Sequence, residues 1–167
     1  MASKCKIVNV ILNSNNKQSG STNNQATYYI DWASILKDNT PYQLHFAYIG
    51  QKNTIDGSNL ALVYADFNTS NKLNTATANG AMTSQMIGFL KPIVLVGSSN
   101  FSYLQAEDPT NVPTIMNTRP NNNSFTISIY DNATPPVLWK DQNAAPAVPA
   151  NYVMTLSFRE LSESNDD

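Results

Sequence analysis

Residues 42–50 read YQLHFAYIG and residues 152–159 read YVMTLSFR. In both stretches apolar side chains occupy every second position, which is the pattern of a β-strand with one buried face and one solvated face. The predicted buried positions are Tyr42, Leu44, Phe46 and Tyr48 in the first stretch, and Tyr152, Met154, Leu156 and Phe158 in the second. These two stretches predict a fold built on β-strands.

Shorter alternating runs recur along the chain, and loops rich in Asn, Gly, Pro, Ser or Thr separate them. Six further strands are predicted at Ile7–Leu12, Ala26–Asp31, Leu60–Phe67, Gln85–Val96, Phe101–Ala106 and Ser124–Tyr130. One helical turn is expected over Trp32–Lys37, capped by Asp31. Loops or irregular structure are expected at Lys72–Ala81, Glu107–Asn123 and Asp131–Pro149.

Eight strands with long loops predict an all-β fold, a single eight-stranded antiparallel jelly-roll sandwich. With the strands lettered B to I in chain order, strands B, I, D and G form one sheet and strands C, H, E and F form the other. In this order the two strands with the clearest apolar–polar alternation, D and I, are central neighbours. Pro92 lies on an outer strand, where a missing N–H is tolerated. The whole chain, 1–167, is predicted to be one domain with a short N-terminal arm (1–5) and a polar C-terminal tail (160–167).

Charged residues make up 13% of the chain, against about 25% in ordinary soluble domains. The 23 Asn, 16 Ser and 14 Thr residues supply polar surface in their place. A net charge of −2 creates no field that attracts phosphates, so direct nucleic-acid binding is not expected. Because these polar residues fall in loops and on outward strand faces, the composition indicates surfaces that contact other protein.

Candidate catalytic and metal-binding side chains are few. Cys5 is the only cysteine and His45 the only histidine, so neither an intramolecular disulfide nor a tetrahedral zinc site of Cys and His can form. His45 is either a general base or, as we favour, a surface residue on the polar face of its strand. The run Glu107-Asp108-Pro109 lacks the spacing of a calcium loop. We therefore expect no enzyme, no catalytic residues, no cofactor and no metal. A small hydrolase that uses His45 and scattered carboxylates stays as an alternative.

We also expect no targeting signal in the sequence. The apolar run near the N-terminus is interrupted at Asn9 and is too short for a signal peptide, and no run approaches the roughly 18 apolar residues of a spanning helix. The expected compartment is therefore intracellular. Four Asn-x-Ser/Thr sequons are therefore expected to be unused; they are Asn68, Asn100, Asn122 and Asn132.

One loop carries a candidate contact segment. Trp139 follows an apolar run made of Pro135, Pro136, Val137 and Leu138. An exposed apolar loop with a tryptophan at its tip would anchor a partner. The equally weighted alternative is that Trp139 folds back and caps the sandwich.

Four segments together resemble the small single-jelly-roll capsid proteins of large double-stranded DNA viruses and their virophages. The segments are 28–32 (YYIDW), 60–66 (LALVYAD), 117–120 (NTRP) followed by 122–129 (NNSFTISI), and 151–158 (NYVMTLSF). The resemblance covers the chain from about Ala26 to Phe158 and rests on the order of the segments and the Asn-rich loops between them.

The resemblance implies a structural protein of the virion, either a minor capsid or a vertex (penton) component. Such a protein would associate with itself, as a pentamer or a trimer, and with other capsid proteins, including a major capsid protein. It carries over no catalytic residue. A chain of one roll cannot itself be a double-roll major capsid protein. The alternative function is a carbohydrate-binding or host-attachment module that uses outward Tyr29, Tyr130 and His45.

Overall fold

The fold was analysed in a computed structural model, which describes residues 6–52, 61–66, 73–77, 80–84, 86–94, 102–106, 114–131, 138 and 151–161. Its strands are β1 (Ile7–Asn13), β2 (Gln25–Tyr29), β3 (Tyr42–Lys52), β4 (Ala61–Ala65), β5 (Leu73–Thr77), β6 (Gly80–Ser84), β7 (Met86–Val94), β8 (Ser102–Ala106), β9 (Thr114–Met116), β10 (Ser124–Asp131) and β11 (Tyr152–Glu160). A 3-10 turn, η1 (Ser14–Asn16), and one short helix, α1 (Trp32–Ile35), complete the described elements.

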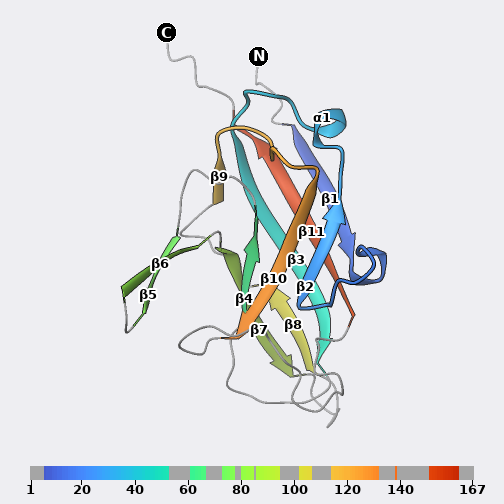
Figure 1. The fold of residues 1–167 in the computed structure, drawn as a ribbon, viewed down its shortest axis with the longest axis vertical. Coiled ribbons are helices and arrows are strands. Elements are labelled where there is room, and N and C mark those ends of the chain that lie inside the picture. The colour runs from blue at the N-terminus through green and yellow to red at the C-terminus, as the bar shows by residue number, and fades with distance from the viewer. Residues whose placement is uncertain are drawn as a thin grey trace.

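The strands form the predicted jelly roll. One sheet has the order β1-β11-β3-β8 and the other the order β2-β10-β4-β7, which are the predicted BIDG and CHEF arrangements. All pairings are antiparallel, and β2 and β10 cross in front of β1, β11 and β3 in Figure 1. Pairing between β7 and β8 joins the two sheets along one side of the sandwich.

The core lies between the two sheets, on the faces that the alternation predicted. β3 and β11 pair from Tyr42↔Glu160 to Gly50↔Tyr152, so the two strands with the clearest apolar–polar alternation are neighbours. The inward side chains of both strands and of β10 are buried; they are Tyr42, Leu44, Phe46, Tyr48, Tyr152, Met154, Leu156, Phe158, Phe125, Ile127 and Ile129. Burial of these side chains drives the folding of a chain with few charges.

Trp32 closes one end of the core. It is fully buried, and its ring packs 5.3 Å from the rings of both Phe125 and Phe158. Its Nε1–H donates to the carbonyl oxygen of Asn122 at 3.0 Å. Three of the four segments that carry the capsid resemblance therefore meet at this side chain.

The end that holds α1 differs from the prediction in two details. The helix covers Trp32–Ile35 and stops short of Lys37, and the side chain of Asp31 makes no capping hydrogen bond. Instead, the carbonyl oxygen of Asp31 accepts bonds from both the N–H and the hydroxyl of Ser34. The turn therefore forms without a cap from Asp31, and the N–H of Trp32 donates to the side-chain oxygen of Asn123 at 3.4 Å.

β7 bends at a β-bulge. Val63 of β4 pairs with Gly88 while the next residue, Tyr64, pairs with Met86, so Ile87 is the extra residue. Gly88 has a φ of +155°, and a Cβ added there would collide with the ring of Phe46 on the facing sheet. Glycine is therefore required both by the backbone conformation and by the close approach of the two sheets.

We expect Gly88→Ala to lower the free energy of unfolding by about 2–4 kcal/mol, because it adds strain at a positive φ and overpacks the core. Gly20→Ala is the matched control: Gly20 also has a positive φ, +86°, but a Cβ there would meet no atom within 4 Å. Urea denaturation of both variants separates the collision from the backbone strain. Equal losses in the two variants would contradict the contact with Phe46.

Pro92 lies on the outer strand of the CHEF sheet, as predicted, but β7 is not a free edge. The described pairing with β4 ends at Leu90, and Pro92 itself pairs with Leu104 of β8. The proline therefore occupies a stretch with one described strand neighbour, where its missing N–H costs no bond to a second strand.

Three predictions of irregular structure were wrong. Lys72–Ala81 contains β5 and the start of β6, which form a hairpin that projects to one side in Figure 1. Glu107–Asn123 contains β9, which pairs with β3 over Tyr42–Leu44. The C-terminal tail does not begin at residue 160, because Glu160 ends β11, pairs with Tyr42 and forms an ion pair with Lys37 at 2.9 Å. The first segment gave no alternating apolar signal because β5 and β6 are mainly small or polar, and the second gave none because β9 is only three residues long.

Candidate interaction surface

The outer face of β1, β11 and β3 carries almost no charge. The strand registers arrange its side chains in rows across the sheet. From one end to the other, the rows are Ile7–Arg159–Gln43, Asn9–Ser157–His45, Ile11–Thr155–Ala47 and Asn13–Val153–Ile49. Arg159 is the only Lys, Arg, Asp or Glu in these rows. We call this surface the BIDG outer face.

Large apolar side chains on the BIDG outer face are open to solvent. The exposed fractions are 71% for Ile11, 59% for Ile49, 57% for Ile7 and 37% for Val153. Ile11, Ile49 and Val153 lie in two adjacent rows. This exposure does not stabilise an isolated sheet, because apolar side chains contribute to stability when they are removed from water. Contiguous exposed apolar side chains with a polar rim are typical of contact surfaces.

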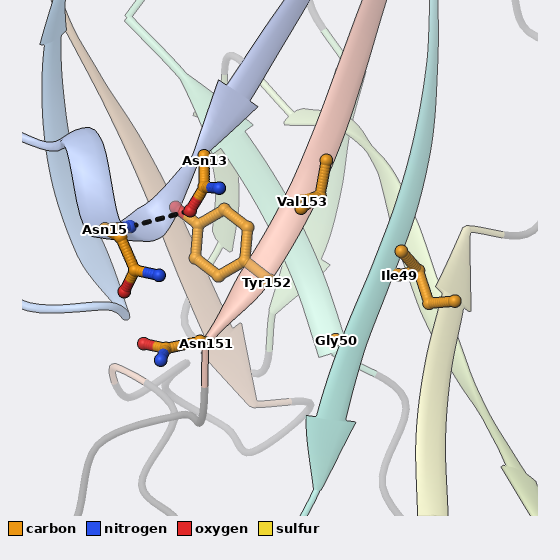
Figure 2. Close-up of a pocket in the computed structure, with 7 residues that line it drawn as sticks. All are labelled: Asn13, Asn15, Ile49, Gly50, Asn151, Tyr152 and Val153. Carbon is orange, nitrogen blue, oxygen red and sulfur yellow. Dashed lines mark hydrogen bonds between the residues drawn. The ribbon is translucent and has the colours of Figure 1, made fainter.

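A hollow of about 230 Å³ lies where the BIDG outer face meets the end of the sandwich. Figure 2 shows Asn13, Asn15 and Asn151 around Tyr152 on one side of it, with Val153 and Ile49 on the other. Its lining is apolar and amide, with no charged side chain. The hollow therefore extends the uncharged character of the face to its edge.

Hydrogen bonds fix the asparagine side of the hollow. The amide oxygen of Asn13 accepts from the N–H of Asn15 at 2.9 Å. The amide oxygen of Asn151 accepts from Asn23 Nδ2 at 3.2 Å, and the N–H of Tyr152 donates to the hydroxyl of buried Ser14 at 2.9 Å. The Asn-rich loop after β1 is thus held against the start of β11.

Three tyrosines lie beneath this end of the face. Tyr28 donates its phenol hydrogen to the hydroxyl of Tyr152 at 3.1 Å, and the rings of Tyr152 and Tyr48 stack with centroids 5.0 Å apart. Burial raises the pKa of all three phenols, and the negative charge that ionised Tyr28 would carry raises the pKa of Tyr48 and Tyr152 further. The cluster is therefore stable only in its neutral form.

We expect the free energy of unfolding to fall as pH rises above about 10, the ordinary pKa of tyrosine. The folded-state pKa of each phenol is raised, so its stabilising contribution is complete below pH 10 and is lost above it. Each such group steepens the decline by about 1.4 kcal/mol per pH unit. Urea midpoints from pH 8 to 11.5 measure the effect, and Tyr48→Phe, which removes one ionisable group, should flatten the slope. A midpoint that stays constant from pH 9 to 11 would contradict it.

The outer face of the other sheet carries an aromatic pair. Tyr64 and Tyr130 are half-buried, and their rings meet edge to face with centroids 5.0 Å apart. Leu138 forms an isolated antiparallel bridge with Tyr130 and is half-buried. Of the predicted contact segment, Leu138 alone lies within the described residues; Pro135, Pro136, Val137 and Trp139 lie outside them. The one described residue of the segment, Leu138, therefore lies next to β10.

His45 is exposed on the BIDG outer face, between Gln43 and Ala47 and opposite Ser157. Tyr29 and Tyr130 are on the outward face of the other sheet, as predicted. Tyr29 is opposite Ser124, which is six residues from Tyr130, or about 20 Å along the strand. The three outward residues of the carbohydrate-binding alternative therefore do not form one platform.

Among the described residues, no three His, Cys, Asp or Glu side chains gather as metal ligands, and no helix is long and apolar enough to cross a membrane. Cys5, the Glu107–Pro109 run and the sequons at Asn68, Asn100 and Asn132 lie outside the described residues. Asn122 is exposed, and its carbonyl oxygen holds Trp32.

The surface that the structure assembles could not be read from single residues. The sequence contains Ile11, Ile49 and Val153 in three separate strands, and the pairing of these strands makes them neighbours. An apolar residue at an outward strand position was the available signal in each strand. Comparison with protein-family models and with curated protein sequences finds no match for this chain.

Proposed function

We propose that the chain is a structural subunit of a virion, a minor capsid or vertex (penton) component that assembles with copies of itself and with a larger major capsid protein. The observation that carries the proposal is the BIDG outer face, an apolar and nearly uncharged sheet surface on a jelly roll. The capsid resemblance of four segments, three of which meet at Trp32, supports the same role.

The physical properties of this face suit a shell subunit. Contacts between uncharged amides, hydroxyls and aliphatic side chains need no desolvation of ions, which is costly when charges are buried. Interfaces of this kind also respond weakly to salt, because screening acts on charges. A subunit surrounded by neighbours can therefore combine several modest contacts into a stable assembly.

Purified virions of the virus that encodes the chain provide the direct test. We expect the protein to be present in them at a stoichiometry that matches a symmetry position of the shell, measured by quantitative mass spectrometry. Absence from the particles would overturn the proposal.

A variant pair tests whether the BIDG outer face makes the contact. Ile49→Lys combined with Val153→Lys places two charges on the apolar rows and should abolish incorporation into particles while near-ultraviolet circular dichroism stays native. Gln25→Lys is the control, because Gln25 is exposed on β2 in the other sheet. Full incorporation of the doubly charged variant would show that another surface makes the contacts.

A further inference from the structure

The two strands at the open side of the sandwich are protected differently. β2 is the edge of one sheet, and the loop before it covers its centre. The carbonyl oxygen of Thr27 accepts from the N–H of Gln18 at 2.8 Å, and the N–H of Thr27 donates to the hydroxyl of Ser21 at 3.3 Å. β1 is the edge of the other sheet. In the part of the chain that the structure describes, no segment pairs with its outer side.

The pairing with β11 determines which backbone groups of β1 face outward. Glu160 N–H donates to the carbonyl oxygen of Lys6 at 3.0 Å, and Ile7 is opposite Arg159. Bonded and non-bonded pairs alternate in an antiparallel ladder. Val8, Val10 and Leu12 therefore bond to β11, while the N–H and C=O groups of alternate residues point to the open side; these residues are Ile7, Asn9, Ile11 and Asn13.

The sequence of β1, IVNVILN, has none of the features that usually protect an edge strand. Lysine, proline, a bulge or a covering loop normally prevents such edges from pairing with another chain. Residues 7–13 contain no charge and no proline, and β-branched residues predominate. Val8 and Val10 face the core but are only half-buried, and no further strand among the described residues covers their outer side.

We propose that β1 pairs antiparallel with β1 of a second copy of this chain, around a two-fold axis at Val10. Hydrogen bonds between the two copies form only in registers that place residues with open-side N–H and C=O groups opposite one another. The register centred on Val10 is the one that pairs every residue of β1, from Ile7 to Asn13. Ile7 then pairs with Asn13 of the second copy, and Asn9 pairs with Ile11. On the inward face Val8 meets Leu12 and Val10 meets its own copy.

A second copy fits this edge better than a charged partner would. The two-fold axis places no like charges opposite one another, because residues 7–13 carry no charge. The flanking Lys6 lies opposite Ser14 of the second copy. The two BIDG outer faces become one continuous sheet surface with Ile11 of both copies at its centre. This pairing does not depend on the virion assignment, and it adds a two-fold contact to whatever other contacts an assembly makes.

The test is sedimentation analysis of the full chain over a range of concentrations. We expect the parent protein to form a dimer, and Asn9→Pro to weaken dimerisation at least tenfold, because proline removes an N–H that faces the second copy and leaves the ladder with β11 intact. Asn9→Ala is the matched control and should dimerise like the parent, since it retains the backbone N–H. A parent that stays monomeric, or Asn9→Pro that dimerises normally, would overturn the proposal.

Cysteine cross-linking tests the register and does not require proline to be tolerated. In a Cys5→Ser background, Val10→Cys should form an intermolecular disulfide, because the two Cα atoms of a non-bonded antiparallel pair are about 4.5 Å apart. Ile11→Cys should not, because its Cα atoms would be roughly 9 Å apart. Cross-linking through Ile11→Cys and not through Val10→Cys would overturn this register. The proposed function is tested separately by incorporation into virions, so failure of one proposal is distinguishable from failure of the other.

Discussion

Leu156→Asp is expected to leave the chain unfolded at room temperature. Leu156 is fully buried at the centre of β11, where it pairs with Val10 on one side and Phe46 on the other. A carboxylate at this position would lose its hydration without gaining a partner, which costs several kcal/mol. That cost is comparable to the total stability of a domain, about 5–15 kcal/mol. Loss of the near-ultraviolet circular dichroism signal and of cooperative urea unfolding measures the outcome.

Ser157→Asp, at the next position, is the control for Leu156→Asp. Ser157 points to the BIDG outer face between Asn9 and His45, where an added carboxylate stays in contact with water. We expect this variant to fold with a stability within about 1 kcal/mol of the parent. Native folding of Leu156→Asp, or unfolding of Ser157→Asp, would mean that the inward and outward faces of β11 have been assigned the wrong way round.

Trp32→Ala is expected to lower the free energy of unfolding by about 3–5 kcal/mol, the usual cost of removing a large buried aromatic side chain. The variant loses the packing against Phe125 and Phe158 and leaves the carbonyl oxygen of Asn122 without its indole donor. A large decrease in the urea midpoint is the expected result. Because Trp32 contacts both sheets and the loop before β10, we expect both sheets to be destabilised and to unfold in a single transition.

Trp32→Phe separates ring packing from the hydrogen bond. It keeps an aromatic ring between Phe125 and Phe158 but removes the Nε1–H that bonds to Asn122. We expect a loss of about 1–3 kcal/mol, smaller than that of Trp32→Ala. If the two variants were equally unstable, the hydrogen bond to Asn122 and not the packing would dominate at this end of the core.

Much of the sheet architecture could be predicted from the sequence, because one buried face leaves a period of two in a strand. The alternation in 42–50 and 152–159 identified the inward side chains of β3 and β11 correctly, and the jelly-roll order made these strands neighbours, as observed. The β5–β6 hairpin was missed because its two strands are made mainly of small or polar residues, and β9 was missed because it is only three residues long. β9 pairs with β3, which lies far away in the chain, whereas β5 and β6 pair with each other.

The candidate surface was less accessible to prediction. Sequence analysis directed attention to the segment that ends at Trp139, since a tryptophan among prolines is conspicuous, and of that segment the structure describes Leu138. The BIDG outer face depends instead on cross-strand register. Ile11, Val153 and Ile49 are isolated apolar residues in the sequence and become adjacent only when β1, β11 and β3 pair.

By itself, the sequence determined the all-β class, the inward face of each long strand and the low charge of the surface, because these properties depend on residue type and on a period of two. The tertiary structure decided which outward residues share a surface, that Gly88 must accommodate Phe46, and that β2 is covered at its edge while no described segment pairs with the outer side of β1. Those features depend on contacts between residues far apart in the chain. The distances between such residues are fixed only when the strands pair and the two sheets pack.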